Sequence, residues 1–483
     1  MLMSYLGALK SWIYIPVFSL FQGSYLTVRI PALVIGAITV WFTFVLLERI
    51  HSRTAAWIGT LLLATDSMFL LTTCFDWGPV ALQHLLSVAG LIAAVSFQRS
   101  GRLQSVALSA FCFGLALWDK ALFLWFLGGV TAGTLLVYPR ELWFHLRSPG
   151  ALKRILLSAL AFCIGCLPLL VYNVTRGYPT LHSTSGFTTK ELYAKSFVLR
   201  GTWEGVALFG YLTNEDDADR PRSPANLLES FSFWLRSAFG EHRRNGMEWA
   251  GFAALLCLPF LQRAARRTAL FFLVAIVVAW LQMGITVNAG GAAHHTVLLW
   301  PMPHLIVAVA FADLACRWGK MGRAVFAFGT FCLICMNLLV TNQYLYAFAR
   351  NGAAGSWTDA IYPLAEDLKK TNDRFLAIID WGITASLDVL AKGRLPLFWS
   401  GDPFTPVPPG KEAPVPDHRL LEEPRVLWIK HTDGNEQITG VNSGLLAFVQ
   451  REHFVIFPVA KYRDRNGREI FETFRMAREK QGK

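Results

Sequence analysis

The segment LTTCFDWGPVALQHLL (residues 71–86) decides the fold that we expect of this chain. It places one carboxylate, Asp76, in a short turn formed with Trp77, Gly78 and Pro79, between two long apolar segments. Both segments are typical of membrane spans, and a charge at a membrane boundary usually faces a water-filled cavity or a functional site. Asp76 is therefore a candidate general base or cation-binding carboxylate. The alternative is an N-cap-like residue or a turn residue before the span that begins at Pro79.

The composition excludes an ordinary soluble enzyme. Of the 483 residues, 54% are hydrophobic and 16% are charged, and the mean hydropathy is +0.39. These values are typical of a polytopic membrane protein with some aqueous mass. The net charge of +12 indicates Lys and Arg in cytoplasmic loops rather than a nucleic-acid surface.

Ten apolar segments have about the length needed to cross a hydrocarbon core. They cover residues 28–47, 55–72, 79–97, 103–118, 121–138, 155–172, 249–261, 269–285, 296–315 and 324–344. We therefore predict an all-α membrane domain of about ten transmembrane helices.

Basic residues concentrate in alternate loops between these segments, which predicts that these loops are cytoplasmic. The basic set is Arg49 and Arg53; Arg99 and Arg102; Arg140, Arg147, Lys153 and Arg154; Arg263, Arg266 and Arg267; and Arg317, Lys320 and Arg323. The opposite, outer face then carries Asp76, Asp119, Lys120, the loop 173–248, the segment 288–295 and everything after about residue 343. We expect a multi-pass protein of the inner (plasma) membrane.

Three parts of the chain follow from this topology. Residues 1–27 lack the features of a signal peptide and predict outer interfacial helices, with a first membrane span as the alternative. Because the span at residue 28 would run inward, we expect that a preceding span is missing from this chain. Residues 28–348 form the membrane domain. Residues 349–483, with an amphipathic segment at 357–370 and strand-like runs at 375–380, 426–430 and 454–460, predict a small outer α/β domain.

Polar residues on the outer face suggest a lipid-phosphate substrate. Lys120 can hold a phosphate, the alternative being a snorkelling Lys paired with Asp119. The adjacent residues His294 and His295 do not share a helix face, which disfavours a metal pair and favours contact with a phosphate or sugar. Asp66 lies inside an apolar segment and is expected to face the protein interior.

No nucleotide-binding or metal-binding motif is visible. The chain has no P-loop, no GxGxxG after a strand and no GxSxG elbow, which argues against an enzyme driven by a nucleotide. The acidic run at residues 214–217 lacks the spaced carboxylates and the glycine of a calcium loop. We predict neither a metal nor a cofactor.

The order and spacing of short motifs resemble the GT-C membrane glycosyltransferases, in particular glycosyltransferase family 39, which includes protein O-mannosyltransferases and lipid A aminoarabinose transferases. The resemblance covers roughly residues 5–345. It rests on Ser4-Tyr5-Leu6, Val28-Arg29-Ile30-Pro31, Leu62-Leu63-Ala64-Thr65, Asp76, Lys120, and His294-His295 before residues 298–303.

The resemblance implies transfer of a sugar from a polyprenyl-phosphate-linked donor to a lipid or protein acceptor outside the cytoplasm. Asp76 would be the catalytic residue, and Arg29, Asp119, Lys120, His294 and His295 would bind substrate, with the cations stabilising the leaving phosphate. The family's principal carboxylate lies in the first outer loop, and this chain begins after that point. The alternative is therefore a catalytically degenerate protein that binds a lipid-linked glycan or a partner.

Overall fold

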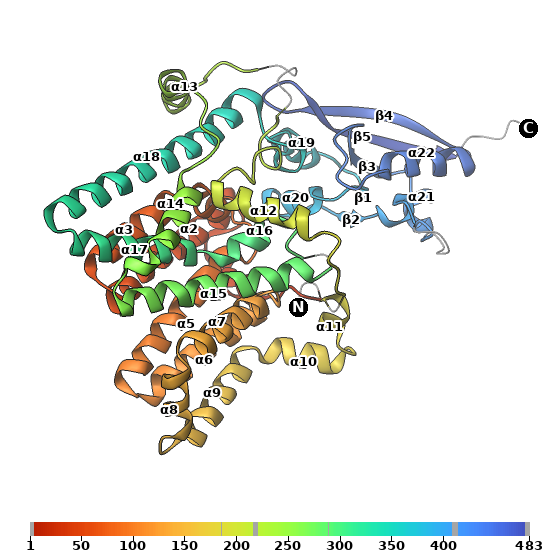
Figure 1. Cartoon of the computed structure of the whole chain (residues 1–483). Coiled ribbons are helices and arrows are strands. Elements are labelled where there is room, and N and C mark those ends of the chain that lie inside the picture. The colour runs from red at the N-terminus through yellow and green to blue at the C-terminus, as the bar shows by residue number, and fades with distance from the viewer. Residues whose placement is uncertain (1–3, 185, 216–220, 288, 408–413, 479–483) are drawn as a thin grey trace, which may run out of the picture. The chain divides into compact units, whose positions relative to one another are not determined.

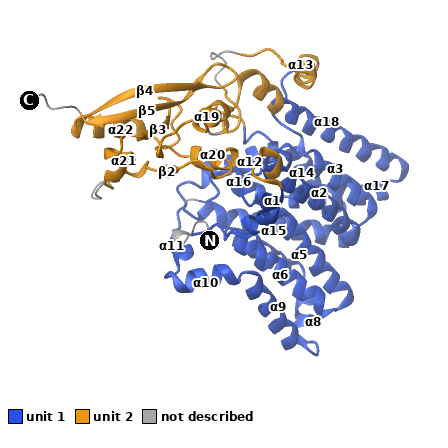
Figure 2. Cartoon of the chain, turned by 180° about the vertical axis from the view of Figure 1, so that it is seen from behind, with its two compact units in different colours: residues 1–20, 28–208, 239–343 blue, residues 21–27, 209–238, 344–483 orange. Residues whose placement is uncertain are grey.

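A computed structural model describes residues 4–184, 186–215, 221–287, 289–407 and 414–478. The chain divides into two compact units, shown in Figure 2. Unit 1 comprises residues 1–20, 28–208 and 239–343, and unit 2 comprises residues 21–27, 209–238 and 344–483.

Unit 1 is helical. Its elements are α1 (Leu9–Phe21), α2 (Tyr25–Ile50), α3 (Arg53–Thr65), α4 (Ser67–Cys74), α5 (Val80–Ser100), α6 (Leu103–Asp119), α7 (Phe123–Val137), α8 (Pro139–Arg147), α9 (Ala151–Gly165), α10 (Leu167–Thr175), α11 (Pro179–Thr184), α12 (Leu192–Glu204), α14 (Met247–Leu256), η1 (Leu258–Phe260), α15 (Arg263–Ile285), α16 (Ala293–Thr296), η2 (Val297–Leu299), α17 (Met302–Arg317) and α18 (Gly319–Asn351), the ends of some belonging to unit 2. In Figure 1, α6 packs between α5 and α9. Helix α15 packs between α7 and α17, and α17 also contacts α3.

Glycines allow these helices to approach closely, as small residues do in membrane proteins. A Cβ at Gly114 of α6 would lie 2.3 Å from the carbonyl oxygen of Phe162 on α9. A Cβ at Gly129 of α7 would lie 2.3 Å from the carbonyl oxygen of Ala275 on α15. These two contacts fix the spacing of the helix pairs whose ends carry the candidate site.

The helices have the length and composition of membrane spans. Among the described residues, five helices are long and apolar enough to cross a bilayer, or up to seven if each of two bent pairs is one span. The chain is a multi-pass membrane protein, and the count of ten spans stays a prediction. One predicted span, 55–72, is in fact broken at Asp66, where α3 and α4 meet at 56°.

Unit 2 contains a five-stranded mixed sheet of order β2-β1-β3-β5-β4. Its elements are α13 (Leu227–Phe239), η3 (Gly355–Trp357), α19 (Ile361–Leu368), β1 (Phe375–Ile378), α20 (Ile383–Leu390), β2 (Leu397–Trp399), η4 (Asp402–Phe404), α21 (His418–Glu422), β3 (Val426–His431), α22 (Val441–Arg451), β4 (Phe454–Arg463) and β5 (Glu469–Arg478). Strand β1 is parallel to β2 and β3, and β5 is antiparallel to β3 and β4. The α/β class was predicted from β1, β3 and β4, whereas β2 and β5 were missed.

Helices cover both faces of this sheet. Alternate residues of a strand point to opposite sides, so one strand contributes side chains to the cores on both faces. Leu376 and Ile378 pack in one core with α19 and α20, and Ala377 and Ile379 pack in the other with η4 and α22.

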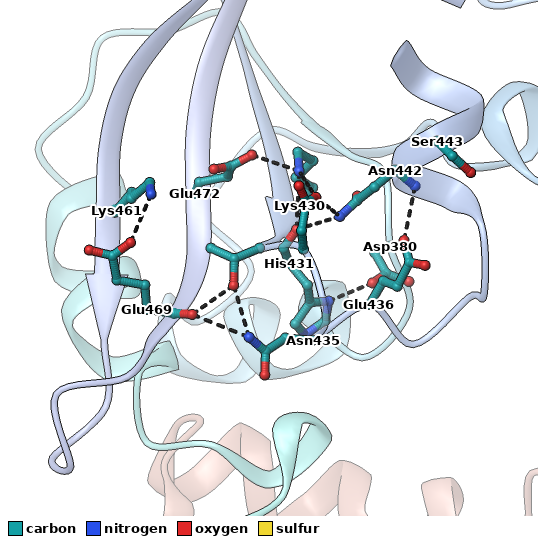
Figure 3. Close-up of polar contacts among 12 residues, drawn as sticks. Asp380, Lys430, His431, Asn435, Glu436, Asn442, Ser443, Lys461, Glu469 and Glu472 are labelled. Atoms are coloured by element: carbon teal, nitrogen blue, oxygen red, sulfur yellow. Dashed lines mark hydrogen bonds and ion pairs between the residues drawn. The ribbon is translucent and has the colours of Figure 1, made fainter. Parts of the chain in front are cut away.

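A buried hydrogen-bond network around Asp380 and His431 fixes the loop after β3, as Figure 3 shows. Asp380 is fully buried and accepts hydrogen bonds from His431 Nδ1 at 2.7 Å and from the backbone N–H groups of Gln437 and Ile438. Burial alone would raise the pKa of Asp380, but these three hydrogen bonds outweigh it and hold the pKa below its usual value. The pair and the backbone contacts give this network a structural role.

Candidate functional site at the Asp76 turn

The Asp76 turn orients its carboxylate away from the helix that follows. Asp76 and Gly78 both have positive φ, of 55° and 58°, a conformation that Asp tolerates better than most residues. The N-cap of α5 is Pro79, and no side chain bonds to this cap. Asp76 is therefore a turn residue, as one alternative had it, but it does not cap α5, and its side chain turns instead to α1.

Two residues of α1 hold the Asp76 carboxylate. Lys10 Nζ lies 2.5 Å from Asp76 Oδ1 and 2.8 Å from the carbonyl oxygen of Gly78. Tyr14 OH donates to the carbonyl oxygen of Val28 at 2.7 Å and lies 3.4 Å from Asp76 Oδ2. Burial, and then the Asp76 charge, raise the pKa of Tyr14 far above its usual value, so the phenol stays a neutral donor.

Lys10 and Tyr14 were not among the predicted site residues. Their signal was present in the sequence, because a single Lys in an apolar aromatic helix, with a Tyr four residues later, places both polar groups on one helix face.

The N-terminal segment also holds the turn between α6 and α7. Leu6 pairs with Lys120 in an antiparallel bridge, and Gly7 N–H donates to the carbonyl oxygen of Asp119 at 2.9 Å. A Cβ on Gly7 would lie 1.8 Å from the carbonyl oxygen of Trp118, so the approach requires glycine. The same segment thus reaches the Asp76 turn through Lys10 and the Lys120 turn through its backbone.

Lys120 and Asp119 are buried side chains that attract each other without an ion-pair contact. Their exposed fractions are 2% and 1%, so Lys120 does not extend its head into solvent as a snorkelling Lys would. Among the described residues, the Lys120 ammonium makes no hydrogen bond or ion pair, and neither Asp119 carboxylate oxygen has a hydrogen bond of ordinary geometry. Burial lowers the pKa of Lys120 to about 8, against the attraction of Asp119. A buried cation that makes no hydrogen bond or ion pair is costly and suits an anionic ligand.

The two predicted histidines complete the cluster. They lie on α16, with ring centroids 4.3 Å apart, and the His294 ring is 5.0 Å from Trp77 in the Asp76 turn. Both imidazoles are close enough to Lys120 to interact with its charge. His295 Nδ1 accepts from Gly290 N–H at 3.1 Å, whereas His294 Nδ1 is buried without a partner in the described part of the chain.

Contacts from α12 support the segment that carries the histidines. The hydroxyls of Thr202 and Thr296 lie 2.6 Å apart. The buried Lys195 ammonium donates to the carbonyl oxygens of Gly284 and Thr286, at 3.2 and 2.7 Å, and so caps the C-terminus of α15. Lys195 was not predicted, because nothing in its polar loop distinguishes it from a solvated Lys.

Arg29 stands apart from this cluster. It is exposed on α2, with its guanidinium 5.5 Å from the centre of the Phe75 ring. The structure thus brings together Asp76, Asp119, Lys120, His294 and His295, with Arg29 on the flank of the Asp76 turn.

Asp66 belongs to a separate polar cluster inside unit 1. It is fully buried, as expected, and its Oδ1 accepts from Phe69 N–H at 2.8 Å and from Trp300 Nε1 at 3.1 Å. Its Oδ2 lies 3.3 Å from His304 Nε2. One carboxylate therefore caps α4 and holds the Trp300 indole just before α17.

The cluster around Lys120 can bind an anion, hold a phosphate against imidazole donors and place carboxylates beside it. Within the described ranges, no group of three or more His, Cys, Asp or Glu side chains could hold a metal ion. Of the acidic run at 214–217, Asp216 and Asp217 lie outside the described residues.

Comparisons with known proteins identify the fold. No family profile and no curated protein matches the sequence. The structure is similar to that of ArnT from Cupriavidus metallidurans bound to undecaprenyl phosphate, with a TM-score of 0.57 and 12% sequence identity over 97% of this chain and 88% of that one. The same protein in the apo state gives a TM-score of 0.53, with the same identity and coverage. The GT-C fold expected from the sequence is confirmed.

Proposed function

We propose that this chain transfers a sugar from a polyprenyl-phosphate-linked donor to a lipid or protein acceptor at the outer face of the plasma membrane. One observation carries the proposal: Lys120 is a buried cation that makes no described hydrogen bond or ion pair, next to Asp119 in sequence and within electrostatic reach of two imidazoles. The fold shared with a protein solved with undecaprenyl phosphate supports a donor of this class.

In the proposed reaction, Lys120 and the histidines bind the donor phosphate. The acceptor hydroxyl oxygen forms a bond to the anomeric carbon, the bond from that carbon to the phosphate oxygen breaks, and its electron pair leaves with the phosphate. The cation and the imidazole donors stabilise the charge that develops on the leaving oxygen. Asp76 takes the proton of the acceptor hydroxyl.

The ion pair with Lys10 bears on this role of Asp76. The Lys10 ammonium lies 2.5 Å from Asp76 Oδ1 and so occupies the oxygen that would accept the proton of the acceptor hydroxyl. Asp76 can act as the base if Lys10 moves to the incoming phosphate, which would release the carboxylate as the donor binds. We assign donor binding to residues 28–348 and acceptor positioning to residues 349–483, as parts of the same proposal.

A second candidate is a protein that binds a lipid-linked glycan without turnover. The Lys10–Asp76 ion pair favours it, because a carboxylate oxygen already held by an ammonium group is not free to contact an acceptor hydroxyl. Both candidates require the same phosphate site at Lys120.

Native mass spectrometry of the purified full chain with undecaprenyl phosphate tests the site. We expect Lys120→Met to lose about ten- to a hundred-fold in affinity, since a hydrogen bond to a charged group contributes about 1.5–3 kcal/mol. Lys320→Met, which removes an exposed Lys at the opposite helix ends, is the control. Equal affinity in Lys120→Met and wild type would refute the phosphate site.

Turnover then separates the two candidates. Release of undecaprenyl phosphate from a synthetic undecaprenyl-phosphate-linked sugar, in proteoliposomes with total lipid and protein extract as acceptor source, would support the transferase. Tight binding without release would support the glycan-binding protein.

A further inference from the structure

The corner between α8 and α9 lies far from the candidate site. Helix α7 begins three residues after Lys120 and ends at Val137, about 22 Å further along its axis. Helix α8 follows, and the chain then bends by 105° into the apolar helix α9. If α9 crosses the bilayer, α8 lies roughly along the membrane plane.

The corner exposes apolar and basic side chains together. The exposed fractions of Trp143 and Phe144 are 56% and 69%, and Leu146 is also exposed. Arg140, Arg147 and Lys153 are exposed beside them. Such a helix, with large apolar residues and basic residues at one boundary, is typical of an interfacial membrane helix.

The basic residues of this corner are not balanced by acids. Glu141 is the one acid between residues 120 and 190. Arg267 of α15 binds it with two parallel hydrogen bonds, of 2.7 and 2.9 Å. Within the described part of the chain, Arg140, Arg147 and Lys153 form no ion pair with a carboxylate, so about three positive charges stay uncompensated.

The corner is also rigidly held, so these groups keep their places. Arg154 donates to the carbonyl oxygens of His145 and Pro149, at 2.9 and 3.1 Å, and so closes the C-terminal end of α8. The guanidinium of Arg147 lies over the Trp143 ring, 4.0 Å from its centre. That stacking holds a cation at the polar edge of the apolar surface.

We propose that this corner binds the headgroups of anionic phospholipids, with α8 in the interface of the bilayer leaflet at the helix ends opposite the Asp76 turn. The aromatic side chains enter the acyl boundary, and Arg140, Arg147 and Lys153 hold the lipid phosphates. Charge complementarity selects anionic over zwitterionic lipid. This proposal is independent of the transfer reaction.

The first experiment measures headgroup preference. The full chain is reconstituted in nanodiscs of phosphatidylglycerol and phosphatidylcholine, and lipids retained on release are counted by native mass spectrometry. Each basic residue near an anionic surface contributes about five-fold, so Arg140→Gln/Arg147→Gln/Lys153→Gln should reduce the preference for phosphatidylglycerol at least about ten-fold. The control with the same charge change is Lys370→Gln/Arg425→Gln/Arg451→Gln in unit 2, for which less than about two-fold is expected.

The second experiment tests the depth of α8. Acyl-brominated phosphatidylglycerol should quench a component of tryptophan fluorescence that Trp143→Phe removes, and brominated phosphatidylcholine should quench it less. An equal headgroup preference in the triple variant and its control would overturn the proposal, as would absence of any quenching assigned to Trp143.

Discussion

Removing the Lys10 ammonium should destabilise unit 1 through Asp76. The change Lys10→Met keeps the apolar stem and removes the donor to Asp76 Oδ1 and to the carbonyl oxygen of Gly78. The side chains of Lys10 and Asp76 are 21% and 6% exposed, so the pair lies between a surface and a buried ion pair. Surface pairs contribute about 0.2–1 kcal/mol, whereas breaking a buried pair costs about 3–5 kcal/mol.

We therefore expect Lys10→Met to lower the free energy of unfolding by about 3 kcal/mol and Asp76→Asn by about 2 kcal/mol. The double variant should cost about as much as Lys10→Met alone, because no unpaired carboxylate is left. The coupling energy between the two sites is then about 2 kcal/mol, near the value of one hydrogen bond to a charged group.

The assay is a double-mutant cycle on the purified full chain, with unfolding by SDS in mixed micelles followed by circular dichroism. The control cycle is Lys369→Met with Glu366→Gln, an exposed pair 2.7 Å apart in unit 2, for which we expect a coupling energy below about 0.5 kcal/mol. Additive single effects at Lys10 and Asp76 would refute the ion pair as a stabilising contact.

Three further predictions concern other parts of the chain. Lys120 must be protonated to hold a phosphate, and burial lowers its pKa to about 8. Binding of undecaprenyl phosphate by wild type should therefore weaken above about pH 8, whereas Lys120→Arg should still bind at pH 9. Equal pH profiles of the two proteins would exclude Lys120 as the phosphate ligand. Asp380→Asn should cost about 3 kcal/mol. It should also reduce the loss of stability expected of wild type below about pH 4, since a carboxyl with a lowered pKa stabilises the fold above its unfolded pKa and ceases to do so as pH falls through the folded value. Thermal unfolding against pH measures both effects. Gly444→Ala should destabilise unit 2 by at least about 1–3 kcal/mol, because its Cβ would lie 2.0 Å from the carbonyl oxygen of Phe404. Thermal unfolding unchanged from wild type would contradict that contact.

Hydropathy predicted the helical membrane part because the apolar segments are long and the basic loops alternate between them. It did not reveal the break at Asp66, since the residues around it, LLLATDSMFLL, remain apolar in sequence. The break depends on Trp300, which lies 234 positions away and donates to the same carboxylate. A local pattern does not contain a contact of that range.

The candidate site was predicted in its charged residues but not in their partners. Asp76, Lys120 and the histidines stand out because charges are rare in apolar surroundings. Lys10 was visible for the same reason, yet only the structure shows that α1 returns to the Asp76 turn. Strand β5 was missed because residues 469–478 carry a charged residue at every third position and so lack the two-residue alternation that indicates a half-buried strand.

The buried Asp66 has a consequence for the biogenesis of the protein. The carboxylate belongs to a segment synthesised early, whereas its donor Trp300 and the neighbouring His304 imidazole are more than 230 residues downstream. At an elongation rate of about 5–20 residues per second, a translating ribosome needs tens of seconds to cover that distance. During that interval the bilayer would hold an ionisable group without these partners, at a cost of about 3 kcal/mol. A nascent chain arrested before residue 296 should therefore be a preferred substrate of membrane quality-control proteases, and one arrested after α17 should be spared.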